Sequence, residues 1–130
     1  MSDKILTLPI ESSERKNYPI LSGCLNYFPA ALAGVARISK IGNDKHNPGQ
    51  QLHHNRAKST DHGDCILRHL VDLQSLLVAI ERDQGSVEVI RQIRDEASSV
   101  AWRALALSQE LHERFGAPLA PGAKNEQTSK

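Results

Sequence analysis

The chain has 130 residues and a formal net charge of +1. This length suits one compact domain and is too short for two domains with separate cores. The near-neutral charge provides no strong field toward nucleic acid or an anionic membrane, so neither is expected as a partner.

The N-terminal stretch MSDKILTLPIESSERK mixes acidic residues with a short apolar run, unlike a secretory signal or a membrane span. No later apolar run approaches spanning length, and we expect a cytoplasmic protein. The two cysteines, Cys24 and Cys65, are too few for a disulfide framework and are expected to be reduced.

Residues 1–22 lack a helical stripe and are expected to form a flexible N-terminal arm, followed by an all-α domain over 23–116. The first helix is expected from about Asn26 to Lys40, with Gly42 placed to stop it. Its apolar residues recur at helical spacing: Leu25, Phe28, Leu32 and Val35.

The connection IGNDKHNPGQQLHHNRAK that follows is long for a link between two helices, which is typical of a functional loop. Residues 37–58 hold five basic residues and one acid, a local net charge of +4. The basic patch of the chain is therefore expected here.

The second helix is expected to begin at Ser59 or Thr60, either of which suits an N-cap, and to end near Asp83. Its apolar stripe consists of Ile66, Leu70, Leu73 and Leu77.

Ser86 can cap a third, unusually long helix that ends at Gly116. Its stripe consists of Val89, Ile93, Ala97, Ala101, Leu105, Leu111 and Phe115. Residues 117–130 hold two prolines and a glycine and are expected to be a disordered tail.

The predicted fold class is all-α, a small antiparallel bundle of about three main helices. Three helices with wide apolar stripes and few aromatic residues make a thin bundle. We therefore expect a homo-oligomer, a dimer or a tetramer, to complete the fold.

Asp61 and Asp64 are three residues apart at the start of the second helix, so both carboxylates project from one face. Carboxylates at this separation suit Mg²⁺ or Mn²⁺ better than zinc. The alternative is that both acids only stabilise the positive end of the helix dipole. Gly63 between them is costly in a helix, which favours close approach of a ligand.

The third helix carries Asp95, Glu96 and Ser99 within the stretch RDEASSVAW. Glu96 falls beside the expected buried side, where a carboxylate needs a cation or hydrogen bonds. A surface acid beside Arg94 or Arg103 is an equally weighted interpretation. Five of the six histidines lie between residues 46 and 69, but no paired CxxC or HxxxH spacing supports zinc.

The stretches PAALAGVARISKIGNDKHNPGQQLHHNRAKSTDHGDCILRHL and AWRALAL resemble a phage family of dATP/dGTP diphosphohydrolases, relatives of the MazG-like all-α nucleoside triphosphate pyrophosphohydrolases. That superfamily carries metal-binding acids as ExxE on one helix and ExxD on the next. Asp61 and Asp64 match the first pair, and Glu96 with Ser99 matches the second. Two aspartates thus replace glutamates, and a serine replaces the last acid.

The resemblance implies cleavage of a purine deoxynucleoside triphosphate, dGTP favoured over dATP, to its monophosphate and pyrophosphate. In some phages such activity supplies dGMP for 2-aminoadenine synthesis. The expected catalytic and metal-binding residues are Asp61, Asp64 and Glu96, with Asp95 as a further ligand of Mg²⁺ or Mn²⁺. The candidate substrate-binding residues are Lys45, His46, Asn47, Arg56, Lys58 and Arg68.

Two other functions fit the same residues. A non-catalytic helical regulator that binds nucleotide or protein would use the aspartates as helix caps, and the serine at position 99 keeps this alternative open. A zinc-stabilised binding module would use the histidines and Cys65.

Overall fold

The computed structural model describes residues 6–56, 59–82 and 86–125. Its elements, in chain order, are the helices and strands α1 (Ser12–Arg15), the π-helix η1 (Leu21–Leu25), α2 (Pro29–His46), β1 (His54–Arg56), α3 (His62–Arg82), α4 (Val87–Arg114) and β2 (Ala123–Asn125). The protein is all-α apart from the two short strands, as the sequence predicts.

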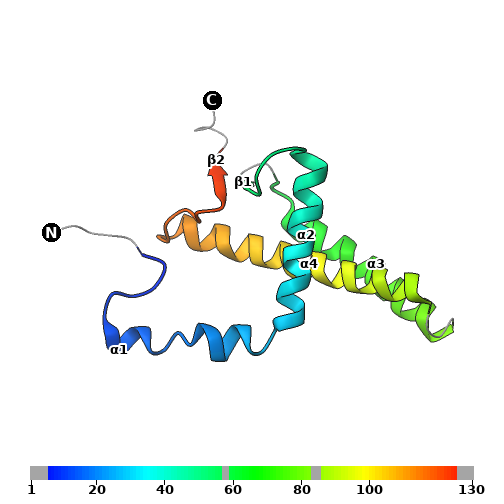
Figure 1. Ribbon diagram of the computed structural model, residues 1–130, viewed down its shortest axis with the longest axis horizontal. Coiled ribbons are helices and arrows are strands. Elements are labelled where there is room, and N and C mark those ends of the chain that lie inside the picture. Colours follow the sequence, from blue (N-terminus) through cyan, green and yellow to red (C-terminus); the bar gives the residue numbers. More distant parts are fainter. Residues whose placement is uncertain (1–5, 57–58, 83–85, 126–130) are drawn as a thin grey trace.

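The three long helices form the body of the molecule. α3 and α4 lie side by side as an antiparallel hairpin, and α2 packs across α4 (Figure 1). Pro29 occupies the first turn of α2, where its missing N–H costs nothing. The Ser86 hydroxyl accepts a hydrogen bond from the Val89 amide at 3.4 Å, which confirms the predicted cap of α4.

Gly42 does not end the first long helix, because α2 continues through it to His46. The helix stops instead at Asn47, which precedes Pro48 and is therefore disfavoured in helical geometry. Gly49 follows with φ +78°, a left-handed conformation that turns the chain away from the helix axis.

The C-terminal segment differs from the disordered tail that we expected. Strand β2 pairs in parallel with β1, with His54 opposite Ala123 and Arg56 opposite Asn125. Residues 126–130, the rest of the expected tail, lie outside the described residues. The segment from 117 to 125 is thus tied back to the loop that follows α2.

One chain buries little. Among the described residues, the buried hydrophobic side chains are Cys65 and Ala106, and the buried polar ones are Asn43 and His62. Several residues of the predicted stripes are exposed instead, including Leu105 at 50% and Phe115 at 80%. The face of α4 that packs inward around Ala106 carries charged side chains, which the apolar pattern does not indicate.

The crossing of α2 and α4 depends on a close approach at Gly34. A β carbon on Gly34 would lie 3.2 Å from the Ser98 Cβ and closer still to the Ser98 hydroxyl, whereas one on Gly42 would meet nothing within 4 Å. The same substitution therefore has opposite consequences at these two positions of one helix.

We predict that Gly42→Ala raises the free energy of unfolding by about 0.5–1 kcal/mol, because alanine is the better helix former. Gly34→Ala lowers it by about 1 kcal/mol, because overpacking at the helix crossing exceeds that gain. Urea unfolding followed by circular dichroism measures both. Equal stabilisation by the two variants would contradict the close approach.

Candidate functional site

A cavity of about 790 Å³ lies between α2, the β1 segment, α4 and the C-terminal segment. Val35, Ile38 and Leu105 form apolar parts of its wall. Its polar lining includes Asn47 and four histidines, His46, His53, His54 and His69. The volume falls within the range of about 300–1,000 Å³ usual for sites that bind small molecules.

The loop after α2 is fixed against the helix that precedes it. Asn43 is buried, and its side-chain amide donates to the Gln50 carbonyl at 2.9 Å. The Asn47 amide donates to the Asn43 side-chain oxygen at 3.2 Å. These bonds hold His46 and Asn47, from the KHNPGQ stretch, at the cavity wall.

The opposite wall is closed by an ion pair between β1 and the end of α4. Arg56 donates to both carboxylate oxygens of Glu113, at 2.7 and 2.8 Å, and both side chains are nearly buried. The same carboxylate accepts from the Gln109 amide at 2.9 Å and from the Ala120 N–H at 3.0 Å. Glu113 therefore joins three segments, and the Arg56 hydrogen bond is the main cause that lowers its pKa to about 2.

His54 is packed beside this ion pair. Its Nδ1 accepts a hydrogen bond from Arg56, since a guanidinium can only donate. Burial, followed by the nearby charge of Arg56, lowers the pKa of His54 below its usual value. His54 is therefore neutral at pH 7 and lies edge-on to the Trp102 ring, with centroids 5.0 Å apart.

Trp102 links α4 to α2 at the cavity. Its indole N–H donates to the Ser39 hydroxyl at 2.7 Å, so the ring is held in one orientation. The guanidinium of Arg103 lies 5.5 Å from the ring centroid, a cation–π distance. An aromatic ring and a cation thus line the same wall.

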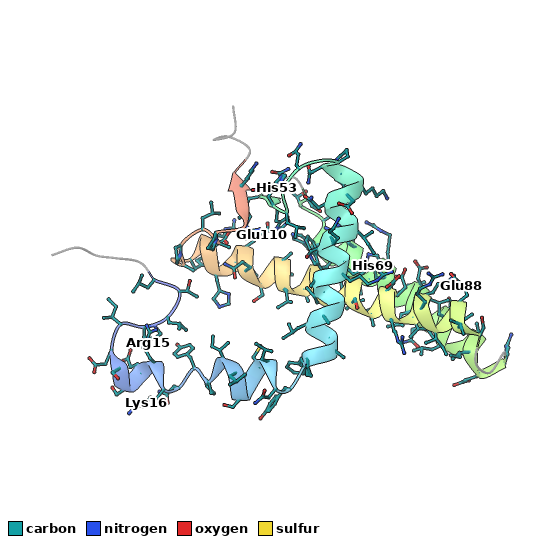
Figure 2. All side chains as sticks on the ribbon, in the orientation of Figure 1. Arg15, Lys16, His53, His69, Glu88 and Glu110 are labelled. Carbon is teal, nitrogen blue, oxygen red and sulfur yellow. The ribbon has the colours of Figure 1, made fainter. Side chains whose placement is uncertain are left out.

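Besides Trp102, two neighbours position Arg103. Its Nη1 donates to the Ser59 hydroxyl at 2.6 Å and approaches the His62 Nδ1 at 3.3 Å. The other ring nitrogen of the buried His62, Nε2, is hydrogen-bonded to the Glu110 carboxylate at 2.7 Å. Figure 2 labels Glu110 on α4. Within residues 6–56, 59–82 and 86–125, Arg103 forms no ion pair with a carboxylate.

The predicted carboxylates of the second helix lie at its exposed start. Asp61 accepts from Arg68 at 3.2 Å and from Ser59 at 3.1 Å, and the Arg68 hydrogen bond is the main cause that lowers its pKa. The Asp61 carbonyl accepts the first helical hydrogen bond, from Cys65 at 3.0 Å. Asp64 is exposed in the first turn of α3.

The predicted carboxylates of the third helix have protein partners. Glu96 is bound to the His69 Nδ1 at 2.7 Å, close to where α2 crosses the hairpin (Figure 2). Asp95 forms an ion pair with Arg37 at 2.9 Å. Both acids line a smaller cavity of about 440 Å³ between α3 and α4, together with Asp72.

The carboxylates have the chemistry that Mg²⁺ or Mn²⁺ prefers, but one chain does not gather them into a complete site. In the part of the chain that the structure describes, no three His, Cys, Asp or Glu side chains are placed to share a metal ion. Asp61 and Glu96 each lie one hydrogen bond from a residue of the large cavity, through Ser59 and His69 respectively.

The predicted substrate-binding residues divide into three groups. His46, Asn47 and Arg56 line the large cavity, although the Arg56 guanidinium is occupied by Glu113 and His54. Lys45 and Arg68 are exposed and are not part of its lining. Lys58 lies outside the described residues.

Arg103 was expected only as a neighbour of Glu96, and Glu110 and Glu113 were not among the predicted site residues. A signal was present, because positions 103, 106, 110 and 113 share one helix face. Of these four positions, three carry charged residues and one carries the small apolar Ala106. Charged side chains grouped on the inward face indicate a polar network.

Comparison of the chain with models of protein families, with curated proteins and with solved structures finds no match. Among the described helices, none combines the length and the hydropathy needed to cross a membrane.

We predict that the Arg56–Glu113 pair makes the fold sensitive to acid. The folded-state pKa of Glu113 is about 2, below its ordinary value of 4.5, so its stabilising contribution is complete above about pH 4.5. That contribution is lost as the pH falls from 4.5 toward 2. Urea unfolding between pH 7 and pH 2.5 measures it.

Glu113→Gln should lower the free energy of unfolding at pH 7 by about 2 kcal/mol and flatten this acid dependence. Glu88→Gln is the matched control on the same helix. It disrupts the exposed Glu88–Arg91 pair, which solvent screens, and should change the free energy of unfolding far less than Glu113→Gln does. Equal effects of the two substitutions would refute the anchoring role of Glu113.

Proposed function

We propose that this protein hydrolyses a purine deoxynucleoside triphosphate, dGTP in preference to dATP, to the monophosphate and pyrophosphate. The observation that carries the proposal is the large cavity, whose wall combines Trp102, Arg103 and the His46–Asn47 loop. The apolar surface left exposed by one chain further supports a homo-oligomer as the working form.

The cavity offers chemistry suited to both parts of a nucleotide. Its apolar and aromatic surface, formed by Val35, Ile38, Trp102 and neutral His54, is suited to a purine ring. The amide of Asn47 can donate to and accept from base edges or the sugar. A volume of about 790 Å³ allows the phosphates to lie in the same cavity.

Arg103 is the residue that we assign to the phosphates. A triphosphate needs fixed cationic donors, and a guanidinium provides two parallel N–H groups for phosphate oxygens. Arg56 is less suited, because its donors are already used by Glu113 and His54. Ser59 and His62 hold Arg103 through one of its nitrogens, which leaves the rest of the guanidinium for a ligand.

The requirement for Mg²⁺ or Mn²⁺ belongs to the same proposal. It rests on the paired spacing of Asp61 and Asp64 and on the position of Glu96 one hydrogen bond from the cavity through His69. We assign no step of the reaction to a metal ion. The bond that breaks joins the α-phosphorus to the bridging oxygen, and water supplies the new oxygen of the monophosphate.

The ion pairs of the predicted acids favour a second candidate, a helical protein that binds a nucleotide without hydrolysing it. Asp61, Asp95 and Glu96 are bound to Arg68, Arg37 and His69. In this alternative the acids stabilise the helices, and the cavity alone performs the function. The two candidates differ in turnover and share nucleotide binding.

Incubation of the pure protein with each common dNTP and NTP, with and without Mg²⁺ or Mn²⁺, separates the candidates. We expect pyrophosphate and dGMP from dGTP, identified by chromatography, only when the cation is added. Saturable binding of dGTP without any product across the metal panel would support the non-catalytic candidate. Release of inorganic phosphate alone would contradict the proposed reaction.

We predict that Asp64→Ala reduces turnover at least 100-fold and weakens Mn²⁺ binding, measured by calorimetry, because it removes half of the carboxylate pair. Glu81→Ala removes an exposed acid from the same helix and should change both quantities less than twofold. Unchanged Mn²⁺ binding in Asp64→Ala would exclude the pair as the cation site.

Arg103→Ala should weaken dGTP binding at least tenfold, because it removes the cavity cation that lacks a carboxylate partner among the described residues. Arg94→Ala removes the same charge from an exposed position of α4 and should leave binding within twofold of wild type. Fluorescence of Trp102 reports binding, and circular dichroism verifies folding. Equal losses in the two variants would indicate a general charge effect.

A further inference from the structure

The N-terminal segment, residues 6–28, is helical in part but covers nothing. Every residue from 10 to 31 is exposed. The segment extends away from the body of the molecule at the start of α2 (Figure 1). The main packing contacts join α3 with α4, α2 with α4, and β1 with β2, so α1 and η1 have no comparable partner.

This segment is rich in large apolar side chains. Ile10, Tyr18, Ile20, Leu21, Leu25, Tyr27 and Phe28 are all between 49% and 71% exposed. Helices as short as α1 and η1 are not stable alone in water, because too few hydrogen bonds offset the cost of nucleation. Their order therefore requires a surface to pack against.

The same chain has an uncovered apolar surface on α3. Leu67, Val71 and Val78 are 61%, 64% and 48% exposed. Their spacing of four and seven residues places them on one helix face. Because α3 packs mainly against α4, the opposite side of α3 has no helix over it among the described elements.

The solvent-accessible surface of the chain indicates how much area a single copy leaves uncovered. A compact protein of 14.3 kDa is expected to expose about 6,800 Å², whereas this chain exposes 9832 Å². The fifteen residues outside the described ranges account for at most about 2,400 Å² when counted as fully exposed, which leaves at least about 7,400 Å² on the other 115 residues. A compact protein of those 115 residues would expose about 6,200 Å². At least about 1,200 Å² of excess remains, more than the roughly 800 Å² that each partner buries in a standard interface.

We propose that the N-terminal segment of one chain docks on the α3 stripe (Leu67, Val71 and Val78) of a second copy, in a symmetric exchange. A second copy carries the same N-terminal segment and the same α3 stripe. One two-fold symmetric contact therefore covers the N-terminal segments and the α3 stripes of both copies. The evidence for this pairing does not rest on the proposed enzymatic activity. It gives the N-terminal segment a role in assembly.

Cys24 allows a direct test, because it is exposed within η1 whereas Cys65 is buried. A benzophenone maleimide attached to Cys24 is photoactivated in a mixture of ¹⁴N and ¹⁵N chains that have been unfolded and refolded together. We expect crosslinks between light and heavy chains that map to α3 by mass spectrometry. Crosslinks found only within one chain would overturn the proposal.

The oligomeric state of the full chain gives a second test. We expect a dimer at 10 µM by light scattering. A variant that carries both Leu21→Ser and Leu25→Ser should associate at least tenfold more weakly. Val71→Asp should do the same from the other side of the contact. Leu119→Ser is the matched control, an equally exposed leucine outside both surfaces. A wild-type monomer, or a dimer unchanged by all these substitutions, would overturn the proposal.

Discussion

The bidentate pair between Arg56 and Glu113 is the interaction on which the candidate site depends. It joins residues 57 positions apart, and the same carboxylate also holds the Ala120 amide. Removing either partner would leave a nearly buried charge uncompensated, which is expensive in a weakly polar environment. Because both segments form walls of the large cavity, the shape of the cavity and the stability of this pair are coupled.

A second polar network extends the same principle along α4. Glu110 fixes His62, His62 and Ser59 fix Arg103, and Arg103 lies over Trp102. Each group limits the orientation of the next one, so the contacts within the protein hold the guanidinium in place. Such preorganisation reduces the entropy lost on binding. In a chain with so small an apolar core, these polar contacts also provide much of its structural specificity.

The helices could be predicted from sequence because they depend on local signals. Periodicity and capping indicated all three long helices, and Ser86 was placed correctly as a cap. The helix stop at Gly42 was wrong, because glycine permits a turn without imposing one and Pro48 ends the helix. Contacts between distant residues decide which face of α4 turns inward. They also decide the pairing of β1 with β2. The hydrogen-bond partners of Arg103 and Glu113 could not be read from spacing for the same reason.

The parallel pairing of β1 with β2 has a consequence for the order in which the site forms. Residues 120–125 are synthesised after all three long helices, yet they complete a wall whose other strand precedes α3. The helical hairpin can form early from local contacts, whereas closing this loop of more than sixty residues is slow. A nascent or partly folded chain therefore has its helices before it has a closed cavity, and the cavity wall is completed in the last step of folding.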